Sequence, residues 1–304
     1  MQDNVLKWIG GKHTLGEFII KRMPPHKKYI EVFVGGGNIF LQKPLADNNI
    51  INDLNGNLIT MYKVINDPIK KEMLKHLFKR CEYSRAMYEY FRTVYRNHIE
   101  WFHLEDTVKA FRYIYLNRVS FNGQGQTYAR RDDSSVLYNL DSVIDKMYNK
   151  IQAGKTVIEK LPFEELLVKV GANNQKYKVY DNKDSFLYLD PPYYITTQTQ
   201  GKAYYEKVMS ISDHTLLRDI LFDYKNAKWL LSYDDVPEIR DLYKLPRTGG
   251  ETNVIASTQS GIYAILTPET HQSAGSNQDE EQTYKRELLI ANYNLSVTNT
   301  LFEV

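Results

Sequence analysis

Apolar residues in this chain form short runs that alternate with helical patterns. Runs typical of strands occur at residues 29–34, 49–53, 156–159, 186–189, 229–233, 261–266 and 287–293. Helices are indicated at residues 38–42, 137–152, 162–168, 212–223 and 238–245. This alternation predicts an α/β fold whose sheet is mostly parallel at its centre. We expect the last two strands to form an edge pair, separated by a very polar and mobile stretch, residues 268–283.

A long helical segment, residues 56–118, interrupts the alternation. Leu58, Tyr62 and Ile65 are spaced three or four residues apart, and alternation of the strand type is scarce. The segment is too long for one crossover helix, so we interpret it as the core of an inserted helical domain. We therefore expect a first domain built from residues 1–57 and 150–304, and an inserted domain at residues 58–149 with a hairpin or loop near 118–135.

The strand predicted at Phe186–Leu189 stops at a carboxylate, Asp190, because Pro191 and Pro192 follow it. Both prolines fix φ, and the carbonyl of Pro191 belongs to a tertiary amide that has no ladder partner. A carboxylate, a rigid carbonyl and the ring of Tyr193 thus lie within four residues. The set suits a flat heterocycle with an exocyclic amine, which two acceptors would hold while the ring stacks. A plain strand terminator with an Asx-type turn explains these residues equally well.

A strand, glycine turn and helix unit is predicted at residues 29–42, with Gly35, Gly36 and Gly37 in the turn. The next predicted strand ends at Asp53, 16 residues after Gly37, where a carboxylate can accept hydrogen bonds from ribose hydroxyls. These features indicate an adenosine-type cofactor, or else a plain βαβ unit. Phe40 stands where the dinucleotide fingerprint requires a third glycine, which disfavours NAD.

Gly10-Gly11-Lys12 does not form a nucleotide phosphate loop. That motif needs a glycine where Leu6 stands and a Ser or Thr where His13 stands. What remains is a flexible Gly-Gly between Trp8 and Lys12, able to close on a small ligand or to form an ordinary N-terminal turn.

Length and composition are those of an ordinary globular protein. The 304 residues and 35.6 kDa suffice for one domain of usual size and a smaller second one. No apolar run approaches a membrane span, and the N-terminus has no apolar core of the signal-peptide kind, so we expect a cytoplasmic protein. The single cysteine, Cys81, excludes an internal disulfide and a cysteine-based metal cluster, and the seven histidines are scattered, so we expect no metal.

Charge is distributed unevenly, although the formal net charge is only +2. Residues 60–131 contain 14 Lys or Arg against 7 Asp or Glu, together with 14 aromatic residues. Basic charge with interleaved aromatic rings is what a nucleic acid attracts, although most of these rings can equally form the core of a helical domain. The loop that ends this segment carries Asn122, Gln124, Arg130 and Arg131, whose side chains can contact base edges or remain solvated.

Two polar segments follow the Asp190 strand. Residues 196–201 form a Thr, Gln and Gly loop that can become ordered when a substrate arrives. Ser212-Asp213-His214 has the composition of a hydrolase triad, but Ser212 is better explained as a helix cap with Asp213 in the first turn.

Taken together, these motifs resemble the Dam-type family of DNA adenine-N6 methyltransferases, in the order that places the cofactor motif before the recognition domain and the catalytic motif after it. Resemblance spans nearly the whole chain except residues 68–106 and 268–283. The matching residues are Leu6–Trp8, Gly10–Lys12, Tyr29–Phe40, Asp53–Asn55, Tyr115–Arg118, Phe121–Gly123, Asp190–Tyr193, Asp213-His214 and Glu287–Ile290.

The resemblance implies a Rossmann-like methyltransferase domain with S-adenosylmethionine as cofactor. Its implied cofactor contacts are Trp8 and Lys12 at the methionine end, Glu31, Phe33, Gly35 and Gly37 as the bed, Asp53 at the ribose, Phe163 at the adenine and Asp190 at the reacting centre. Its implied catalytic motif is Asp190, Pro191, Pro192 and Tyr193, and Asn117 and Arg118 join the loop residues as DNA contacts. Val32 and Pro162 depart from the family pattern, which often has Pro and Asp at these positions.

The implied reaction is methyl transfer to N6 of an adenine flipped out of double-stranded DNA, with Asp190 and the Pro191 carbonyl as acceptors for the amine. The same chemistry would serve RNA adenine or cytosine N4. A non-catalytic, cofactor-sensing nucleic-acid binder and a nicotinamide-dependent oxidoreductase are the alternatives from other classes. The loop at 122–135 lacks the pattern of GATC-methylating relatives, so that specificity is not transferred. A cognate restriction enzyme is a candidate partner, and we expect a monomer or weak dimer.

Overall fold

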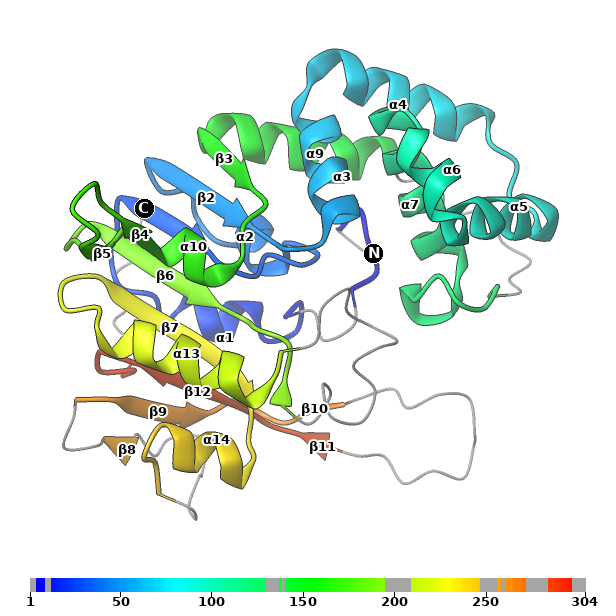
Figure 1. Cartoon of the computed structure of the whole chain (residues 1–304). Helices are drawn as coiled ribbons and strands as arrows, with labels where there is room; N and C mark the ends of the chain where they lie inside the picture. The colour runs from blue at the N-terminus through cyan, green and yellow to red at the C-terminus, as the bar shows by residue number, and fades with distance from the viewer. Residues whose placement is uncertain are drawn as a thin grey trace. The chain divides into compact units, whose positions relative to one another are not determined.

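The structure is a computed structural model that describes residues 4–8, 12–129, 137, 140–194, 209–246, 256–257, 261–271 and 284–296 (Figure 1). Contacts divide the chain into two compact units. The first unit comprises residues 1–11, 34–41 and 47–160, and the second unit comprises residues 12–33, 42–46 and 161–304. These units are defined by packing, so the functional division at residues 58–149 remains a prediction.

The first unit is mainly helical, as the spacing of its apolar residues predicts. Its helices after the second strand are α3 (Gly56–Asn66), α4 (Pro68–Arg80), α5 (Arg85–Arg96), α6 (His98–His103), α7 (Asp106–Val119) and α9 (Leu140–Ala153). Helices α3 to α7 each begin at a side chain that accepts hydrogen bonds from the first turn, namely Asn55, Asp67, Ser84, Asn97 and Glu105. Helix α7 packs on α3, α4 and α5, and its Tyr115 and Ile114 are fully buried.

The first unit also contains the glycine turn. Helix α2 (Asn38–Gln42) follows the turn, and β2 (Asn48–Asn52) pairs in parallel with β3 (Thr156–Glu159). After α7, the short helix η1 (Phe121–Gly123) and an antiparallel bridge between Ser120 and Tyr128 close a compact loop.

The second unit is built on a sheet that is parallel on one side and antiparallel on the other. Strands β1 (Lys28–Glu31), β6 (Ser185–Leu189) and β7 (Lys228–Asp234) pair in parallel in that order. Strands β12 (Glu287–Ala291), β9 (Tyr263–Leu266) and β8 (Ala256–Ser257) continue the sheet with antiparallel pairing. All five residues of β6 are buried, and the strand is paired along both edges, with β1 and with β7.

Within the described residues, the helices of the second unit are α1 (Gly16–Ile20), α10 (Phe163–Leu167), α13 (Ile211–Phe222) and α14 (Pro237–Leu242). Helix α13 lies between β6 and β7 in sequence, and the indole of Trp229 on β7 donates to the Leu221 carbonyl at 3.1 Å. Parallel strands need such a crossover. Two small hairpins complete the unit, β4 (Val168–Val170) with β5 (Lys176–Lys178), and β10 (Thr270–His271) with β11 (Tyr284–Lys285).

The predicted α/β class with a mostly parallel centre is confirmed, and three details of the prediction are wrong. The first strand ends at Glu31 rather than Val34, because the chain turns at Val34, whose carbonyl accepts from the Gly37 N–H. The last two predicted strands, β9 and β12, pair with each other, but they are not the edge of the sheet, because β8 continues it beyond β9. The hairpin β4–β5 was not predicted. Most of the stretch at 268–283 lies outside the described residues.

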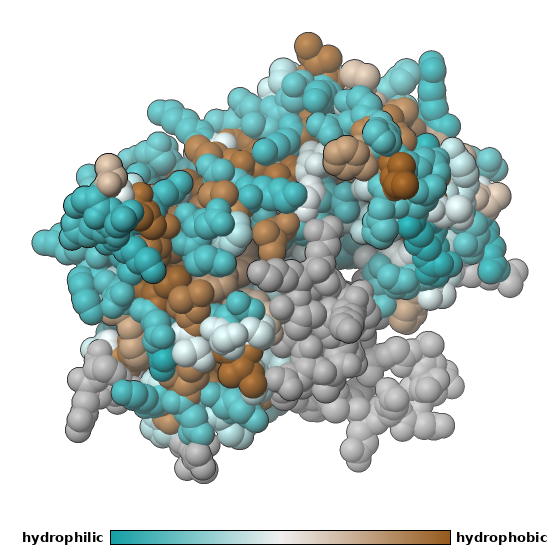
Figure 2. Space-filling view, in the orientation of Figure 1, coloured by the Kyte–Doolittle hydropathy of each residue, from teal (hydrophilic) through white to brown (hydrophobic). Residues whose placement is uncertain are grey.

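Large buried side chains form the cores of both units, with Tyr62, Tyr88 and Tyr115 in the first and Tyr188 and Trp229 in the second. The surface over α4 to α7 is largely hydrophilic with scattered apolar residues (Figure 2). None of the helices in the described ranges has both the length and the apolar character needed to cross a membrane.

Candidate active site

The end of β6 carries a carboxylate in a buried setting. Asp190 follows Leu189 directly, its side chain is 21% exposed, and the next residue, Pro191, is buried. The position is fixed because β6 pairs with β1 and β7 up to its last residues, and the two prolines prevent the strand from continuing. The apolar run and the two prolines thus predict this strand end correctly.

A buried ion group surrounds this carboxylate. Lys12 Nζ lies 2.8 Å from Asp190 Oδ1 and 3.5 Å from Glu287 Oε2, and the Lys12 side chain is only 3% exposed. The same ammonium lies 4.8 Å from the centre of the Tyr193 ring. One cation thus contacts two carboxylates and an aromatic ring, and the formal charge of the group is negative.

Burial changes the acid–base properties of this group. Burial raises the pKa of Asp190 to about 6, with Glu287 acting in the same direction and Lys12 opposing both. Burial lowers the pKa of Lys12, but Asp190 and Glu287 outweigh it, so the pKa of Lys12 is raised. Lys12 is therefore a cation at neutral pH, and Asp190 is mostly ionised there.

Glu287 is the member of this group to which the sequence analysis gave no role. It opens β12, whose other residues are apolar, and it is 8% exposed. A buried carboxylate is costly unless it is paired. The sequence signal for a role of Glu287 was an acidic residue at one end of an apolar strand. That signal does not reveal its partner, Lys12, which is distant in sequence.

The glycine turn of the first unit requires glycine. Gly35 and Gly37 have φ of +48° and +73°, and a Cβ at Gly35 would lie 2.6 Å from the Trp8 indole nitrogen. At Gly37 a Cβ would lie 2.6 Å from the Tyr62 hydroxyl. The glycines therefore permit close approach of Trp8 and Tyr62 to the backbone, where the sequence analysis expected a ligand to approach.

Asp53 lies directly after β2 and is held to the same turn. Its Oδ2 accepts from the Gly35 N–H at 2.9 Å and its Oδ1 accepts from the Asn55 N–H at 2.9 Å. The carboxylate thus links the turn to the start of α3.

The remaining predicted cofactor residues lie in the second unit. Glu31 ends β1, is 2% exposed, and accepts a hydrogen bond from the Tyr29 hydroxyl at 2.7 Å. The rings of Phe33 and Phe163 lie 6.0 Å apart. Phe163 is thus a buried residue of α10, with Pro162 at the N-terminal end of that helix.

Comparison with known proteins identifies the family to which this chain belongs. Residues 8–256 match the family model of the D12 class N6 adenine-specific DNA methyltransferases. The chain belongs to this family. It is thus an enzyme that methylates N6 of adenine in DNA, and it requires a methyl donor.

Individual relatives support the assignment. A Lactococcus lactis type II methyltransferase, M1.LlaDCHI, is 29% identical over 78% of this chain and 83% of the relative. The DNA adenine methylase of Vibrio cholerae is 26% identical over 85% of this chain and 90% of the relative. The DNA N-6-adenine-methyltransferase of Escherichia phage P1 is 26% identical over 80% of this chain, and this chain spans only 31% of that relative.

Two of the methyltransferase's predicted DNA contacts have partners inside the first unit. Asn117 donates to the Lys7 carbonyl at 2.8 Å and accepts from the Lys7 N–H at 2.8 Å. Arg118, 6% exposed, donates to the carbonyls of Asn4 and Val5. Both side chains thus fix the N-terminal segment to the end of α7, and their contact with DNA remains a prediction.

The loop predicted to contact DNA is described in part. Gln124 follows η1 and is partly exposed. Asn122 lies within η1. Arg130 and Arg131 lie outside the described residues, as does the polar loop at 196–201. The roles of all these residues in DNA contact or in ordering on substrate remain predictions.

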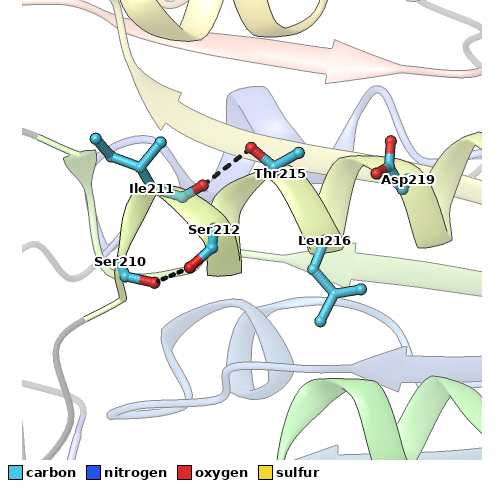
Figure 3. A pocket seen from close by; sticks show the side chains of 6 residues that line it. All are labelled: Ser210, Ile211, Ser212, Thr215, Leu216 and Asp219. Carbon is cyan, nitrogen blue, oxygen red and sulfur yellow. Dashed lines mark hydrogen bonds between the residues drawn. The ribbon is translucent and has the colours of Figure 1, made fainter.

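The start of α13 corrects one detail of the methyltransferase's predicted helix cap. Ser210, rather than Ser212, caps α13, and Asp213 completes a capping box with it. The Ser210 and Ser212 hydroxyls lie 2.7 Å apart (Figure 3). His214 is buried, with its Nδ1 2.6 Å from the Tyr233 hydroxyl. The cap was assigned two residues too late, because two serines precede Asp213.

The hollow drawn in Figure 3 follows the first turns of α13. It is lined by Ser210, Ile211, Ser212, Thr215, Leu216 and Asp219. The Thr215 hydroxyl donates to the Ile211 carbonyl, so the polar groups of this hollow largely bond to one another. Across the ranges that the structure describes, no three His, Cys, Asp or Glu side chains are placed to hold a metal ion.

Proposed function

We propose that S-adenosylmethionine is the methyl donor of this enzyme. When bound, this cofactor supplies a methyl group on a positively charged sulfonium. A sulfonium suits the ion group of the second unit, because Asp190 and Glu287 outnumber the one cation, Lys12. The turn at Gly35 and Gly37, where a Cβ would collide with Trp8 or Tyr62, fits a close-packed adenosine site.

The proposed cofactor residues have separate tasks. Asp53 accepts hydrogen bonds from the ribose hydroxyls while its backbone bonds hold the glycine turn. Trp8, Gly35 and Gly37 form part of the bed, and Phe163 contacts the adenine ring of the cofactor. Glu31 and Phe33 complete the bed, and Lys12 serves the methionine end.

We further propose that Asp190 and the Pro191 carbonyl each accept one hydrogen of the adenine N6 amine. The amine is a poor nucleophile because its lone pair is delocalised into the ring. Two acceptors favour the geometry in which this lone pair is available, and they stabilise the positive charge that grows on nitrogen. Lys12 approaches Oδ1 of Asp190, so we assign Oδ2 to the amine.

The substrate form that we propose is a double-stranded DNA whose target adenine is flipped out. Flipping costs a few kcal/mol, and stacking on Tyr193 offsets part of this cost. Tyr193 is 8% exposed and its ring faces the Lys12 ammonium, so the adenine has to displace part of the present packing. Residues 58–149 form the proposed recognition domain. A cognate restriction enzyme and a monomer or weak dimer remain predictions.

The observation that carries the proposal is the partly buried Asp190 carboxylate in contact with the buried Lys12 ammonium. Asp190→Ala is expected to abolish methyl transfer and to leave cofactor binding measurable by calorimetry. The assay uses labelled S-adenosylmethionine with matched DNA and RNA, followed by hydrolysis to nucleosides. Wild-type turnover in this variant, or label in cytosine or RNA adenine, would overturn the proposal.

Tyr193→Ala tests the flipping role separately. If the ring stabilises the flipped adenine, its loss slows transfer to duplex DNA more than transfer to single-stranded or mismatched DNA, where less energy is needed to expose the base. Equal losses on both substrates would contradict this role. Binding of the cofactor serves as the control for folding.

A further inference from the structure

Glu287 is fixed by its backbone beside the catalytic carboxylate. Its N–H donates to the Thr267 hydroxyl at 2.9 Å, and its carbonyl accepts from the Thr267 N–H at 2.8 Å. On its other side, Glu287 is paired with Asp234 in the register between β12 and β7. Hydrogen bonds to Thr267, directly after β9, and pairing with Asp234 of β7 therefore fix the backbone position of Glu287.

The side chain of Glu287 faces the ion group. Its Oε2 lies 3.5 Å from Lys12 Nζ, and the charges of Asp190 and Glu287 both add to the burial that raises the pKa of Tyr193. Glu287 thus acts on Lys12, which contacts Asp190, and on Tyr193, which belongs to the same Asp-Pro-Pro-Tyr segment. An apolar residue would pack at this buried position without the cost of desolvating a charge.

We propose that Glu287 is a positioning residue for the methyl transfer. Glu287 holds the Lys12 ammonium so that Lys12 binds one oxygen of Asp190 and leaves the other oxygen for the adenine amine. This inference rests on the proposed role of Asp190. The geometry supports it, because the Lys12 ammonium lies 2.8 Å from Oδ1 of Asp190 and 3.5 Å from Oε2 of Glu287.

Removal of the Glu287 charge has two physical consequences. Without a second carboxylate, a desolvated ammonium can approach Asp190 more symmetrically and compete with the amine for both oxygens. The negative charge of Glu287 also favours protonation of Asp190, so its removal lowers the pKa of Asp190. Turnover therefore falls at neutral pH, while the acid limb of the pH–rate profile moves to lower pH.

The test compares Glu287→Gln, Glu287→Asp and the matched control Glu269→Gln. Glu269 forms an ion pair with Arg286, the residue before Glu287, at 2.8 Å, and it is about half exposed. We expect Glu287→Gln to lower kcat between about tenfold and about 100-fold, with the KM for DNA little changed. Glu287→Asp keeps the charge and should retain the acid limb, and Glu269→Gln should match the unaltered enzyme.

A second measurement follows the Asp190 carboxyl carbon by NMR during a pH titration. In Glu287→Gln this carbon should titrate at lower pH than in the unaltered protein, whether or not Asp190 takes part in catalysis.

An unchanged kcat and an unchanged acid limb in Glu287→Gln would overturn the inference. So would equal losses of kcat in Glu287→Gln and Glu287→Asp with no movement of the acid limb, which is the result of a merely structural role. Retained activity in Asp190→Ala would instead reject the proposed role of Asp190 itself.

Discussion

At the scale of single residues, the proposed role of Asp190 predicts how the activity depends on pH. Burial raises its pKa to about 6, and only the ionised form accepts hydrogen bonds through both oxygens. We therefore expect kcat to fall about tenfold per pH unit below about pH 6, measured in single-turnover assays. A rate that stays constant down to pH 5 would contradict this prediction.

The same pKa predicts that this loss is not caused by unfolding. The pKa of Asp190 is higher in the folded chain than in an unfolded chain, so protonation of Asp190 favours the folded state. Its contribution to stability is present below the ordinary aspartate pKa and is lost as the pH rises through about 6. Thermal unfolding at each pH is the control that separates the ionisation of Asp190 from acid denaturation by other groups.

Arg118 provides a second prediction at this scale. Its guanidinium donates to the carbonyls of Asn4 and Val5 in a buried setting. Arg118→Met keeps much of the side-chain volume but leaves these carbonyls without that donor, which should lower the free energy of unfolding by about 1–3 kcal/mol in urea titrations. Arg80→Met, at an exposed arginine of α4, is the control. Lost DNA affinity with unchanged stability would favour a DNA contact instead.

The residues of the candidate site were predictable where local sequence determines the geometry. Asp190 was found because an apolar strand and two prolines fix its place, and Gly35 and Gly37 because tight turns need glycine. The contact of Lys12 with Asp190 and Glu287 was not predictable, because it depends on strand order. The burial of Arg118 was also not predictable, because its partners, Asn4 and Val5, are more than 100 residues away in the sequence.

At the scale of elements, the loop after α7 depends on a glycine that faces the N-terminal segment. Gly123 has φ of +74°, and a Cβ there would lie 2.4 Å from the Lys7 carbonyl oxygen. Gly125 has φ of +69°, but a Cβ there would meet nothing within 4 Å. Substitution of either glycine therefore strains a left-handed backbone, but only at Gly123 would the new Cβ also collide with a neighbouring atom.

We therefore expect Gly123→Ala to destabilise the protein more than Gly125→Ala. Both variants bear a strain of about 1–3 kcal/mol from the left-handed backbone, and only Gly123→Ala also displaces Lys7 and disturbs its bonds to Asn117. Urea unfolding of the two variants measures the difference. Equal free energies of unfolding in the two variants would mean that the N-terminal segment can move away from the new methyl group without loss of stability.

Elements were predicted best where they are long or buried. The helices from α3 to α7 have clear spacing and capping residues, and β6 is an apolar run bounded by prolines. The hairpin β4–β5 was missed because its strands have three residues each and are largely exposed, so their pattern resembles that of a loop. The position of β12 between β7 and β9 was missed because strand order depends on packing of the whole sheet.

At the scale of the whole molecule, charge should govern DNA affinity although the net charge is only +2. Residues 60–131 carry twice as many basic as acidic residues, but some are neutralised by α9, where Asp145 contacts both Lys71 and Lys75. We expect the affinity for DNA to fall with salt, by about 0.9 logarithmic units per logarithmic unit of salt for each phosphate that is contacted. Fluorescence anisotropy from 50 to 200 mM salt measures the slope, and cofactor affinity is the control. A slope near zero would exclude the basic segment as the DNA-binding surface.

The close contact of Trp8 with the glycine turn has an optical consequence. The chain has three tryptophans, and the other two report on the protein interior: Trp229 is fully buried, and Trp101 is 8% exposed with its indole bonded to Asn57. Trp8 is the tryptophan that touches the predicted cofactor bed. A change of intrinsic emission on addition of a methyl donor would thus be assigned to a single chromophore, and it would vanish in Trp8→Phe. Such a change would report binding of the methyl donor without a label.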